Sequence, residues 1–247
     1  MFSRFEALQT DWRFEYKYRL NYQQYLQIRS AILPDMRKDD YTLAAPHHKY
    51  LVRSLYFDSD TFQNFIEKVD GDCDRVKLRI RTYHTAPLED ISLRVELKAR
   101  KGLTVEKHST WTSFSHYQSF MKNWHWQETD DPVLSEFERY VQLKGQSPKI
   151  IVEYLREGYR ARSGAQIRIT FDHKVKSAHS NILFPEKPFF RQHHPGKVIL
   201  EIKCMKSQPL WLRQLVFQHG LRITPNSKYT QGIEIARKDV VTPMWSY

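Results

Sequence analysis

Positively charged side chains recur at every second position in several stretches of this 247-residue sequence. Lys77, Arg79 and Arg81 alternate with apolar residues in 76–83, and the same spacing repeats in 13–20. A guanidinium offers paired N–H donors to phosphate oxygens, whereas an ammonium acts as a compact point charge. Rows of both groups are therefore suited to binding phosphate groups and to transferring them.

The overall charge also favours an anionic partner. The chain has 39 Lys and Arg residues against 28 Asp and Glu residues, which gives a net charge of +11. Nucleic acid, nucleotide, polyphosphate and membrane head groups all fit this charge. With 40% hydrophobic residues and only eight glycines, the composition excludes a disordered tail and a glycine-rich linker.

Alternation of charged and apolar residues predicts strands, because successive side chains of an extended chain point to opposite sides. We expect strands at 13–20, 50–57, 76–83, 92–99, 104–112, 150–156, 167–174 and 200–203. Helices are expected at 21–33, 60–69, 132–144, 209–219 and 228–237, with another from Ser113 or Ser115 to Trp124. Asn21, Asp60 and Asp131 are placed to begin three of them, and 177–197 is expected to be a loop. This order predicts an α+β fold, a single antiparallel β-rich domain over residues 1–247 with peripheral helices.

The charged side chains of these strands share one face and are mostly basic. The basic ones are Arg13, Lys17, Arg19, Lys77, Arg79, Arg81, Arg94, Lys98, Arg156, Arg168, Lys174 and Lys203, and the acidic ones are Glu15, Glu96, Asp172 and Glu201. A sheet with one face in water is the simpler interpretation of alternating strands. Neighbouring strands lie only about 4.8 Å apart, however, so like charges at this density repel unless an anion lies among them. The alternative is a closed barrel whose lumen is a cationic tunnel for a chain of phosphates, with helices on its apolar outer side.

The sequence gives little support for a zinc site or for the common nucleotide-binding motifs. Cys73 and Cys204 lie far apart without a CxxC motif, which argues against a zinc site and favours a reducing compartment. No HExxH motif, P-loop or dinucleotide-binding motif is present. Surface positions are expected for the two histidine doublets, His47-His48 and His193-His194.

Two further features of the sequence bear on whether the protein binds a nucleobase and whether it crosses a membrane. Trp124 and Trp126 could bracket a nucleobase, although a core or helix-cover role is the simpler interpretation. No stretch is apolar and long enough for a spanning helix, so we expect a cytoplasmic protein that reaches a membrane only through a partner.

Seven charged motifs occur in a fixed order along the chain. They are Arg13-Phe-Glu15-Tyr-Lys17-Tyr18, Lys77-Leu-Arg79-Ile-Arg81, Glu96-Leu-Lys98, Tyr154-Leu-Arg156, Arg168-Ile-Thr-Phe-Asp172, Glu201-Ile-Lys203 and Ser227-Lys228-Tyr229. In this order they resemble the VTC domain, the catalytic domain of the vacuolar transporter chaperone polyphosphate polymerases and their bacterial relatives. That family belongs to the triphosphate tunnel metalloenzyme, or CYTH-like, superfamily. The resemblance covers about residues 13–229 and implies an antiparallel, roughly eight-stranded closed β-barrel whose lumen binds triphosphate and a divalent metal.

One position departs from the wider superfamily. Its hydrolases and cyclases usually open with an ExExK motif, whereas Arg13 stands here where the first glutamate would be. The loss of that carboxylate fits the polymerase branch better than the metal-rich triphosphatase branch.

The resemblance also implies roles for individual residues. The residues implied in phosphoryl transfer are Lys17, Arg79, Arg81 and Lys228, and those implied in binding substrate phosphates are Lys98, Tyr154, Arg156, Arg168, Lys203 and Ser227. Glu201 is the leading ligand for Mn²⁺ or Mg²⁺, with Glu15 second, because these hard cations prefer carboxylate oxygens. Glu15, Glu96 and Asp172 are secondary candidates, each of which could instead pair with neighbouring cations, and we favour the ion pair for Glu96.

The activity implied by the resemblance is transfer of the γ-phosphate of ATP to a growing inorganic polyphosphate chain. Hydrolysis of triphosphate or of a nucleoside triphosphate is one alternative, and a sensor that binds without turnover is another. The expected partners are ATP, polyphosphate, pyrophosphate or triphosphate, and a membrane protein that receives the product is a further candidate. Nucleic acid is not expected, because the basic residues follow strand alternation and do not cluster in one arm or helix. The oligomeric state is left open.

Overall fold

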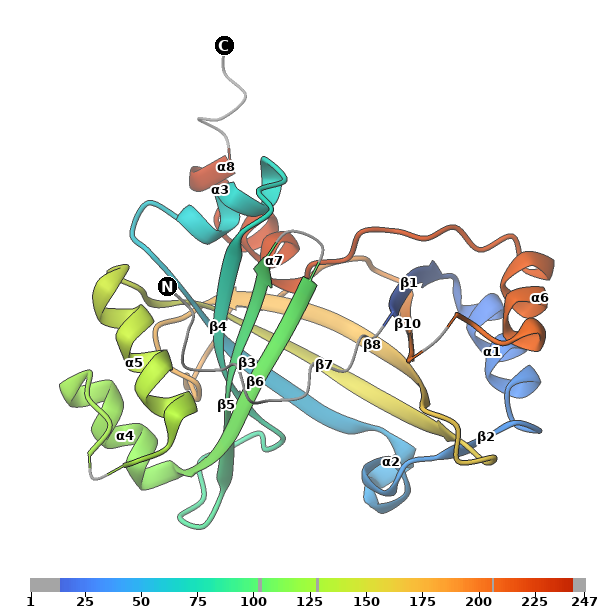
Figure 1. The fold of residues 1–247 in the computed structure, drawn as a ribbon, viewed down its shortest axis with the longest axis horizontal. Helices are drawn as coiled ribbons and strands as arrows, with labels where there is room; N and C mark the ends of the chain where they lie inside the picture. Colours follow the sequence, from blue (N-terminus) through green and yellow to red (C-terminus); the bar gives the residue numbers. More distant parts are fainter. Residues whose placement is uncertain (1–13, 102–103, 128, 206, 242–247) are drawn as a thin grey trace.

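Eight strands follow one another through a single antiparallel, hydrogen-bonded path (Figure 1). The computed structural model describes residues 14–101, 104–127, 129–205 and 207–241. In spatial order the strands are β1 (Phe14–Leu20), β10 (Val198–Cys204), β8 (Ile167–His179), β7 (Ser147–Ala161), β3 (Tyr50–Asp58), β4 (Arg75–Thr82), β5 (Ser92–Lys101) and β6 (Thr104–Ser113). Two short strands bring the sheet to ten, β2 (Met36–Lys38) beside β7 and β9 (Arg191–Gln192) beside β8. The expected α+β class with an antiparallel sheet is confirmed.

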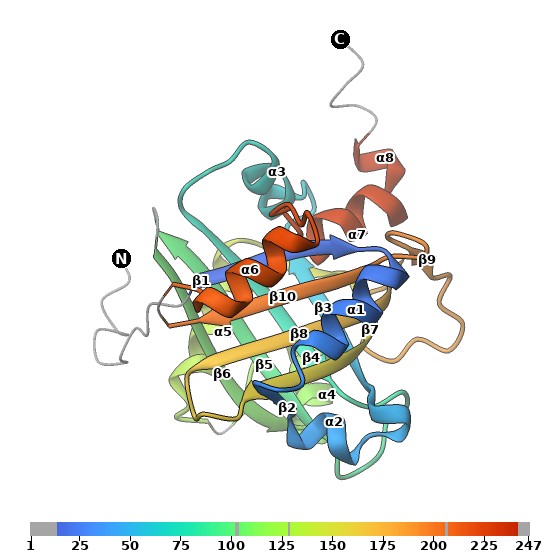
Figure 2. The same ribbon diagram turned by 90° about the vertical axis from the view of Figure 1, so that its right-hand side faces the viewer.

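The sheet is strongly curled but is not a closed barrel. In Figure 2 the strands β1, β10 and β8 cross in front of β4, β5 and β6, so the sheet folds over on itself. Its two end strands, β1 and β6, share no backbone ladder within the described residues. The expected closure is therefore not confirmed. A side-chain ion pair connects the two ends of the sheet instead: Lys98 Nζ of β5 lies 3.3 Å from Glu15 Oε2 of β1.

Helices lie mainly against the apolar outer side of the curled sheet. They are α1 (Tyr22–Ala31), α2 (Asp40–Ala44), α3 (Gln63–Val69), α4 (Phe114–Asn123), α5 (Pro132–Leu143), α6 (Leu210–Gln218), α7 (Lys228–Ala236) and α8 (Lys238–Val241), with a 3₁₀ turn, η1, at Pro46–His48. Side-chain oxygens of Asn21 and Asp131 accept backbone N–H groups at the starts of α1 and α5, as expected from the sequence. Across the described ranges, no helix combines the length and the apolar character that crossing a membrane requires.

Helix α3 begins later than predicted. Asp60 was expected to start it, but the helix begins at Gln63, after Phe62 in a left-handed conformation with a φ of 57°. Asp60 pairs instead with Lys149 of β7, at 2.5 Å between Oδ1 and Nζ. The carboxylate is thus engaged by a strand and not by the helix.

Strand β8 also departs from the expected alternation. Lys174 has a φ of 50° and lies where the register between β7 and β8 shifts. Such a bulge inserts one extra residue and changes which side chains point inward. Lys174 is exposed, and the prediction that it shares the charged face is wrong. The strand then continues to His179, into a segment expected to be a loop.

Helix α7 is packed on the concave side of the sheet. Its buried Tyr229 and Ile233 belong to an apolar cluster with Val152 and Tyr154 of β7. A Cβ atom added to Gly232 would lie 2.8 Å from Ser177 Oγ, so only a glycine allows this close approach to β8. The chain just before α7 therefore lies at the inner side of the sheet.

A buried carboxylate anchors α7. Asp58, at the end of β3, is fully buried and accepts a short hydrogen bond from the Tyr229 hydroxyl. The same carboxylate accepts the backbone N–H groups of Ser59, Asn64 and Phe65, which ties β3 and α3 to α7. The bonds from Asn64, Phe65 and Tyr229 join this carboxylate to two helices, so its loss should loosen β3, α3 and α7 together.

We predict that Tyr229→Phe lowers the free energy of unfolding by about 1–3 kcal/mol, because a buried carboxylate loses a donor that water cannot replace. Urea denaturation measures the change. The matched control is Tyr22→Phe, since Tyr22 lies on α1 and is 60% exposed. Equal stabilities for the two variants would contradict the anchoring role of Tyr229.

Candidate phosphate-binding site

The strand register gathers the alternating charges onto the concave side of the sheet. Arg79 of β4 is paired with Glu96 of β5, and Lys17 of β1 is paired with Glu201 of β10. We define the charged face as Glu15, Lys17, Arg19, Lys77, Arg79, Arg81, Arg94, Glu96, Lys98, Lys107, Arg156, Arg168, Asp172, Glu201 and Lys203, together with Lys228 of α7. Of the basic residues expected there, Arg13 lies outside the described residues. The face holds many more cations than carboxylates.

Glu96 is the centre of the first charge cluster. Its carboxylate is 1% exposed and contacts Arg79, Lys107 and, at 3.6 Å, Arg81, with Arg94 at 3.9 Å. Burial alone would raise the pKa of Glu96, but the charges of Arg79 and Arg81 outweigh it and hold the pKa well below its usual value. The expected ion-pair role of Glu96 fits this geometry, in which one carboxylate holds four cations.

Asp172 is the centre of the second cluster. It is fully buried and accepts two hydrogen bonds from Arg156, at 2.6 and 2.8 Å, while Lys228 Nζ lies 2.6 Å from Oδ2. Burial favours a raised pKa, but Arg156 and Lys228 lower the pKa of Asp172 to about 2. Both cations also lie over the ring of Tyr154, at 5.1 and 4.7 Å from its centroid. The cluster thus fixes three residues that the sequence assigned to the site.

Glu15 and Glu201 form the third cluster. Both contact Lys203 Nζ, at 3.4 and 3.0 Å, and Glu15 also contacts Lys98. Burial opposes the charge of Glu201, but Lys203 and Lys17 hold the pKa of its carboxyl well below the usual value. The two carboxylates predicted as metal ligands therefore lie together and are ionised. Among the residues placed by the structure, no three His, Cys, Asp or Glu side chains gather as a ready-made metal cluster.

The segment that leads into α7 carries a further pair of lysines. Lys77 Nζ donates to Ser227 Oγ at 3.0 Å, and Lys17 Nζ donates to the carbonyl oxygen of Asn226 at 3.3 Å. Burial, followed by the charge of Arg75, lowers the pKa of Lys77 to about 7. Within the described chain, neither Lys17 nor Lys77 has a carboxylate within ion-pair distance. This end of the charged face is therefore the most suited to accept an external anion.

Sequence reasoning placed Lys77 on the basic face but did not single it out, and it missed Lys107. The alternation around Lys77 gave no sign that Ser227 lies beside it, because the two are 150 residues apart. Lys107 was hidden because 104–112 mixes polar and apolar residues without clean alternation.

Arg168 lies apart from the other predicted phosphate ligands. Its side chain is 45% exposed and pairs with Asp39 at 3.0 Å, and one guanidinium nitrogen lies 3.3 Å from the Tyr50 hydroxyl. Burial by neighbouring groups, opposed by Arg156 and Arg168, raises the pKa of Tyr50 to about 12, so its hydroxyl stays protonated. Arg168 belongs to the rim of the charged face and not to its centre.

The core role favoured for Trp126 is confirmed, whereas the surface position expected for His193 is wrong. Trp126 is 2% exposed and stacks on Phe120 with 4.1 Å between ring centroids, so it cannot bracket a base with Trp124. His193 was expected at the surface but is 6% exposed, and its Nε2 lies 2.6 Å from Ser177 Oγ. The other doublet is at the surface, since His47 and His48 are exposed.

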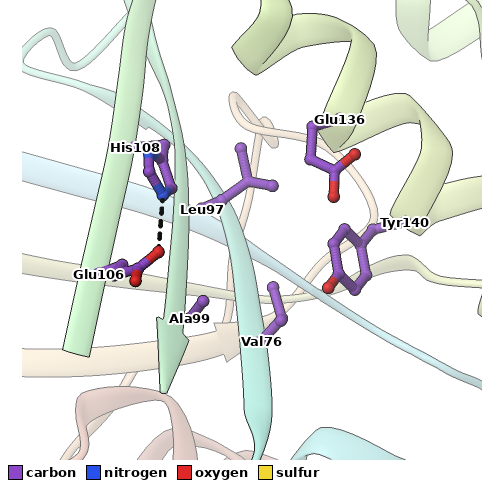
Figure 3. Close-up of a pocket in the computed structure, with 7 residues that line it drawn as sticks. All are labelled: Val76, Leu97, Ala99, Glu106, His108, Glu136 and Tyr140. Atoms are coloured by element: carbon purple, nitrogen blue, oxygen red, sulfur yellow. Dashed lines mark hydrogen bonds and ion pairs between the residues drawn. The ribbon is translucent and has the colours of Figure 1, made fainter. Parts of the chain in front are cut away.

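A small pocket lies on the opposite side of the sheet from the charged face. It holds about 20 Å³, about the room that one water needs, and its lining is Val76, Leu97, Ala99, Glu106, His108, Glu136 and Tyr140 (Figure 3). The pocket lies between α5 and the outer side of β4, β5 and β6. Its volume is too small for a phosphate chain, and the carboxylates of Glu106 and Glu136 would repel one.

A solved structure of low sequence identity shares the fold of this chain. A candidate adenylate cyclase from Bacillus halodurans superposes with a TM-score of 0.53 at 12% identity, covering 86% of this chain and 92% of that one. A protein from Pyrococcus horikoshii, PH1819, gives a TM-score of 0.46 at 15% identity, covering 89% and 96%. No curated protein sequence matches the chain significantly. The family model of the VTC domain matches residues 12–237, and the chain belongs to the VTC domain family.

We predict that Glu96→Gln lowers the free energy of unfolding by about 3 kcal/mol, because its cations lose their shared buried counter-charge. The folded pKa of Glu96 lies below its usual 4.5. The stabilisation is therefore complete above that pH and declines as the pH falls, so the two proteins should converge in acid. Urea denaturation at pH 7 and pH 3 measures both effects.

The matched control is Glu89→Gln, because Glu89 lies on an exposed loop. If Glu96→Gln were as stable as this control at pH 7, the carboxylate would not be what holds the cations together.

Proposed function

We propose that the protein transfers the γ-phosphate of ATP to the end of an inorganic polyphosphate chain on the charged face. Membership of the VTC domain family supports a polyphosphate- or nucleotide-related function. The observation that carries the proposal is the pair of cation clusters around Glu96 and Asp172, which present fixed positive charge to the same interior. Each cluster also contacts a tyrosine. Arg79 donates to the Tyr56 hydroxyl at 2.9 Å, and the guanidinium of Arg156 lies over the ring of Tyr154.

In the proposed reaction, a terminal oxygen of the polyphosphate chain attacks the γ-phosphorus of ATP. The bond from that phosphorus to its bridging oxygen breaks, and ADP leaves with the electron pair. Phosphoryl transfer needs alignment of the two oxygens and neutralisation of the charge on the transferred group more than it needs a covalent partner. Arg79 and Arg81 supply fixed guanidinium donors from β4, and Arg156 supplies another from β7.

Lys228 is the residue best placed to act on the transferred group. Asp172 raises the pKa of Lys228 despite its burial, so the ammonium is charged. It lies at the first turn of α7, where free backbone N–H groups also favour a phosphate oxygen. Ser227 caps that helix and holds Lys77, which brings a second lysine to the same end.

The carboxylates of Glu201 and Glu15 fit a divalent cation that binds together with the substrate. Mg²⁺ and Mn²⁺ commonly bind to one or two carboxylates and to substrate phosphates, with water completing the shell. Glu201 and Glu15 would hold the ion in place of Lys203, their present shared partner. The bound ion would neutralise phosphate charge during transfer.

The deciding assay incubates the purified protein with γ-labelled ATP and Mn²⁺ and follows labelled chains, orthophosphate and remaining ATP. We predict long labelled polymer from the wild type and at least a hundredfold loss in Lys228→Ala, because removing one fixed donor to developing charge typically costs about 10²–10³ in rate. Lys122→Ala is the matched control, since Lys122 is exposed on α4. Orthophosphate alone would indicate a triphosphatase, and binding without turnover a sensor; either result would overturn the polymerase assignment.

We predict that Glu201→Gln shifts the Mn²⁺ titration of activity to about tenfold or higher concentrations, because a neutral amide is a poorer ligand for a hard cation. Glu186→Gln, at an exposed loop position, is the control and should titrate like the wild type. An unchanged Mn²⁺ titration in Glu201→Gln would exclude this carboxylate as a metal ligand.

A further inference from the structure

Four aromatic side chains meet at the rim of the charged face. Tyr41 comes from α2, Tyr50 from β3, Tyr83 follows β4, and Trp111 comes from β6. The ring centroids are 5.8 Å apart for Tyr41 and Tyr50, 6.1 Å for Tyr41 and Tyr83, and 6.3 Å for Tyr83 and Trp111. We call these four residues the aromatic rim. They lie within the distances at which rings support one another's orientation.

The aromatic rim remains open to solvent. Tyr41 is 59% exposed and Trp111 is 48% exposed, although both rings contact other rings. By comparison, Trp126 packs in the core and is only 2% exposed. The rim therefore offers flat apolar surface that the fold itself does not use.

The rim is continuous with the cationic interior. Tyr50 is paired with Arg156 across β3 and β7, and Trp111 is paired with Arg94 across β6 and β5, with the guanidinium 5.4 Å from the indole centroid. Tyr83 follows Arg81 by two residues, about 6.8 Å along an extended chain. A ligand whose phosphates reach Arg81 and Arg156 would thus place its next group against these rings.

Phosphate is not the group that suits the rim. The face of an aromatic ring carries negative potential and offers no donor to an anion. A planar, uncharged ring suits it well, because bases stack on aromatic side chains regardless of their identity. A nucleoside triphosphate combines such a ring with the phosphates that the charged face fits.

We propose that the aromatic rim is a stacking site for the nucleobase of a nucleoside triphosphate whose phosphates lie on the charged face. This assignment rests on the proposed function, because it requires phosphates in the interior. Stacking without hydrogen-bond readout makes the site tolerant of base identity, so ATP and GTP should bind with similar affinity. Polyphosphate has no base and would pass the rim without using it.

The test compares ATP with inorganic triphosphate, which carries the phosphates without the base. Dissociation constants are measured by calorimetry in EDTA for the wild type, Trp111→Ala and Tyr41→Ala. We expect each alanine variant to weaken ATP binding by about 5- to 100-fold, the range of base stacking on an aromatic residue. Triphosphate binding should change by less than about twofold, because the rings do not contact phosphate. Taking the ratio of variant to wild type for each ligand cancels the charge difference between the ligands.

Matched controls are available on the outer surface. Tyr22 is 60% exposed on α1 and Trp124 is 36% exposed after α4, so Tyr22→Ala and Trp124→Ala should leave ATP binding unchanged. Trp111→Phe keeps a ring on β6 and should retain most of the ATP affinity, which guards against a folding defect in the alanine variant.

The outcomes separate the two proposals. Triphosphate binding by the wild type with no loss of ATP affinity in either rim variant would overturn the stacking site and leave the charged face intact. An equal loss for both ligands would also overturn it, because the rings would then act on the phosphates or on the fold. Failure of the wild type to bind either ligand, both in EDTA and with Mn²⁺ present, would overturn the proposed function and the stacking site together.

Discussion

Buried carboxylates that hold several cations close together are the constraint on which the structure depends. Two like charges 4 Å apart repel by about 4 kcal/mol at an effective dielectric constant of 20. The charged face places Arg79, Arg81 and Lys107 around one point, and Glu96 is the group that makes this arrangement stable. Asp172 does the same for Arg156 and Lys228. Because the carboxylates are fewer than the cations, the face keeps positive charge for an external anion.

Three features of the fold bring these charges together. The antiparallel register aligns the inward charges of neighbouring strands, and the curl of the sheet brings β5 within reach of β1. Helix α7, anchored through Tyr229 to Asp58, then adds Lys228 from outside the sheet. Each of these is a separate part of the chain, so the site exists only when the whole sheet is formed.

Much of this arrangement follows from the sequence. Strict alternation fixed the strands around Lys77, Lys98 and Glu201, and with them the side to which each charge points. The helix capped by Ser227 was also predictable, because the serine precedes an apolar periodic run. Motif order over the chain identified the family, which single motifs could not do.

Other features depend on contacts between distant parts of the chain. Lys174 leaves the charged face because a bulge shifts the register, and nothing in 167–174 marks the bulge. Asp60 pairs with a lysine 89 residues away and so does not cap its helix. Whether β1 and β6 pair and close the barrel depends on how strongly the sheet curls. The alternation of charged and apolar residues does not determine that curl. The aromatic rim joins four elements, and Tyr41 lies in a short helix that the sequence did not suggest.

A crystal structure of the protein with inorganic triphosphate bound is the most direct measurement of where the anion lies. We expect phosphate oxygens within hydrogen-bonding distance of Arg79 and Arg81 on one side and of Arg156 and Lys228 on the other. Triphosphate bound only on the outer surface, with those four side chains still paired solely to Glu96 and Asp172, would contradict it.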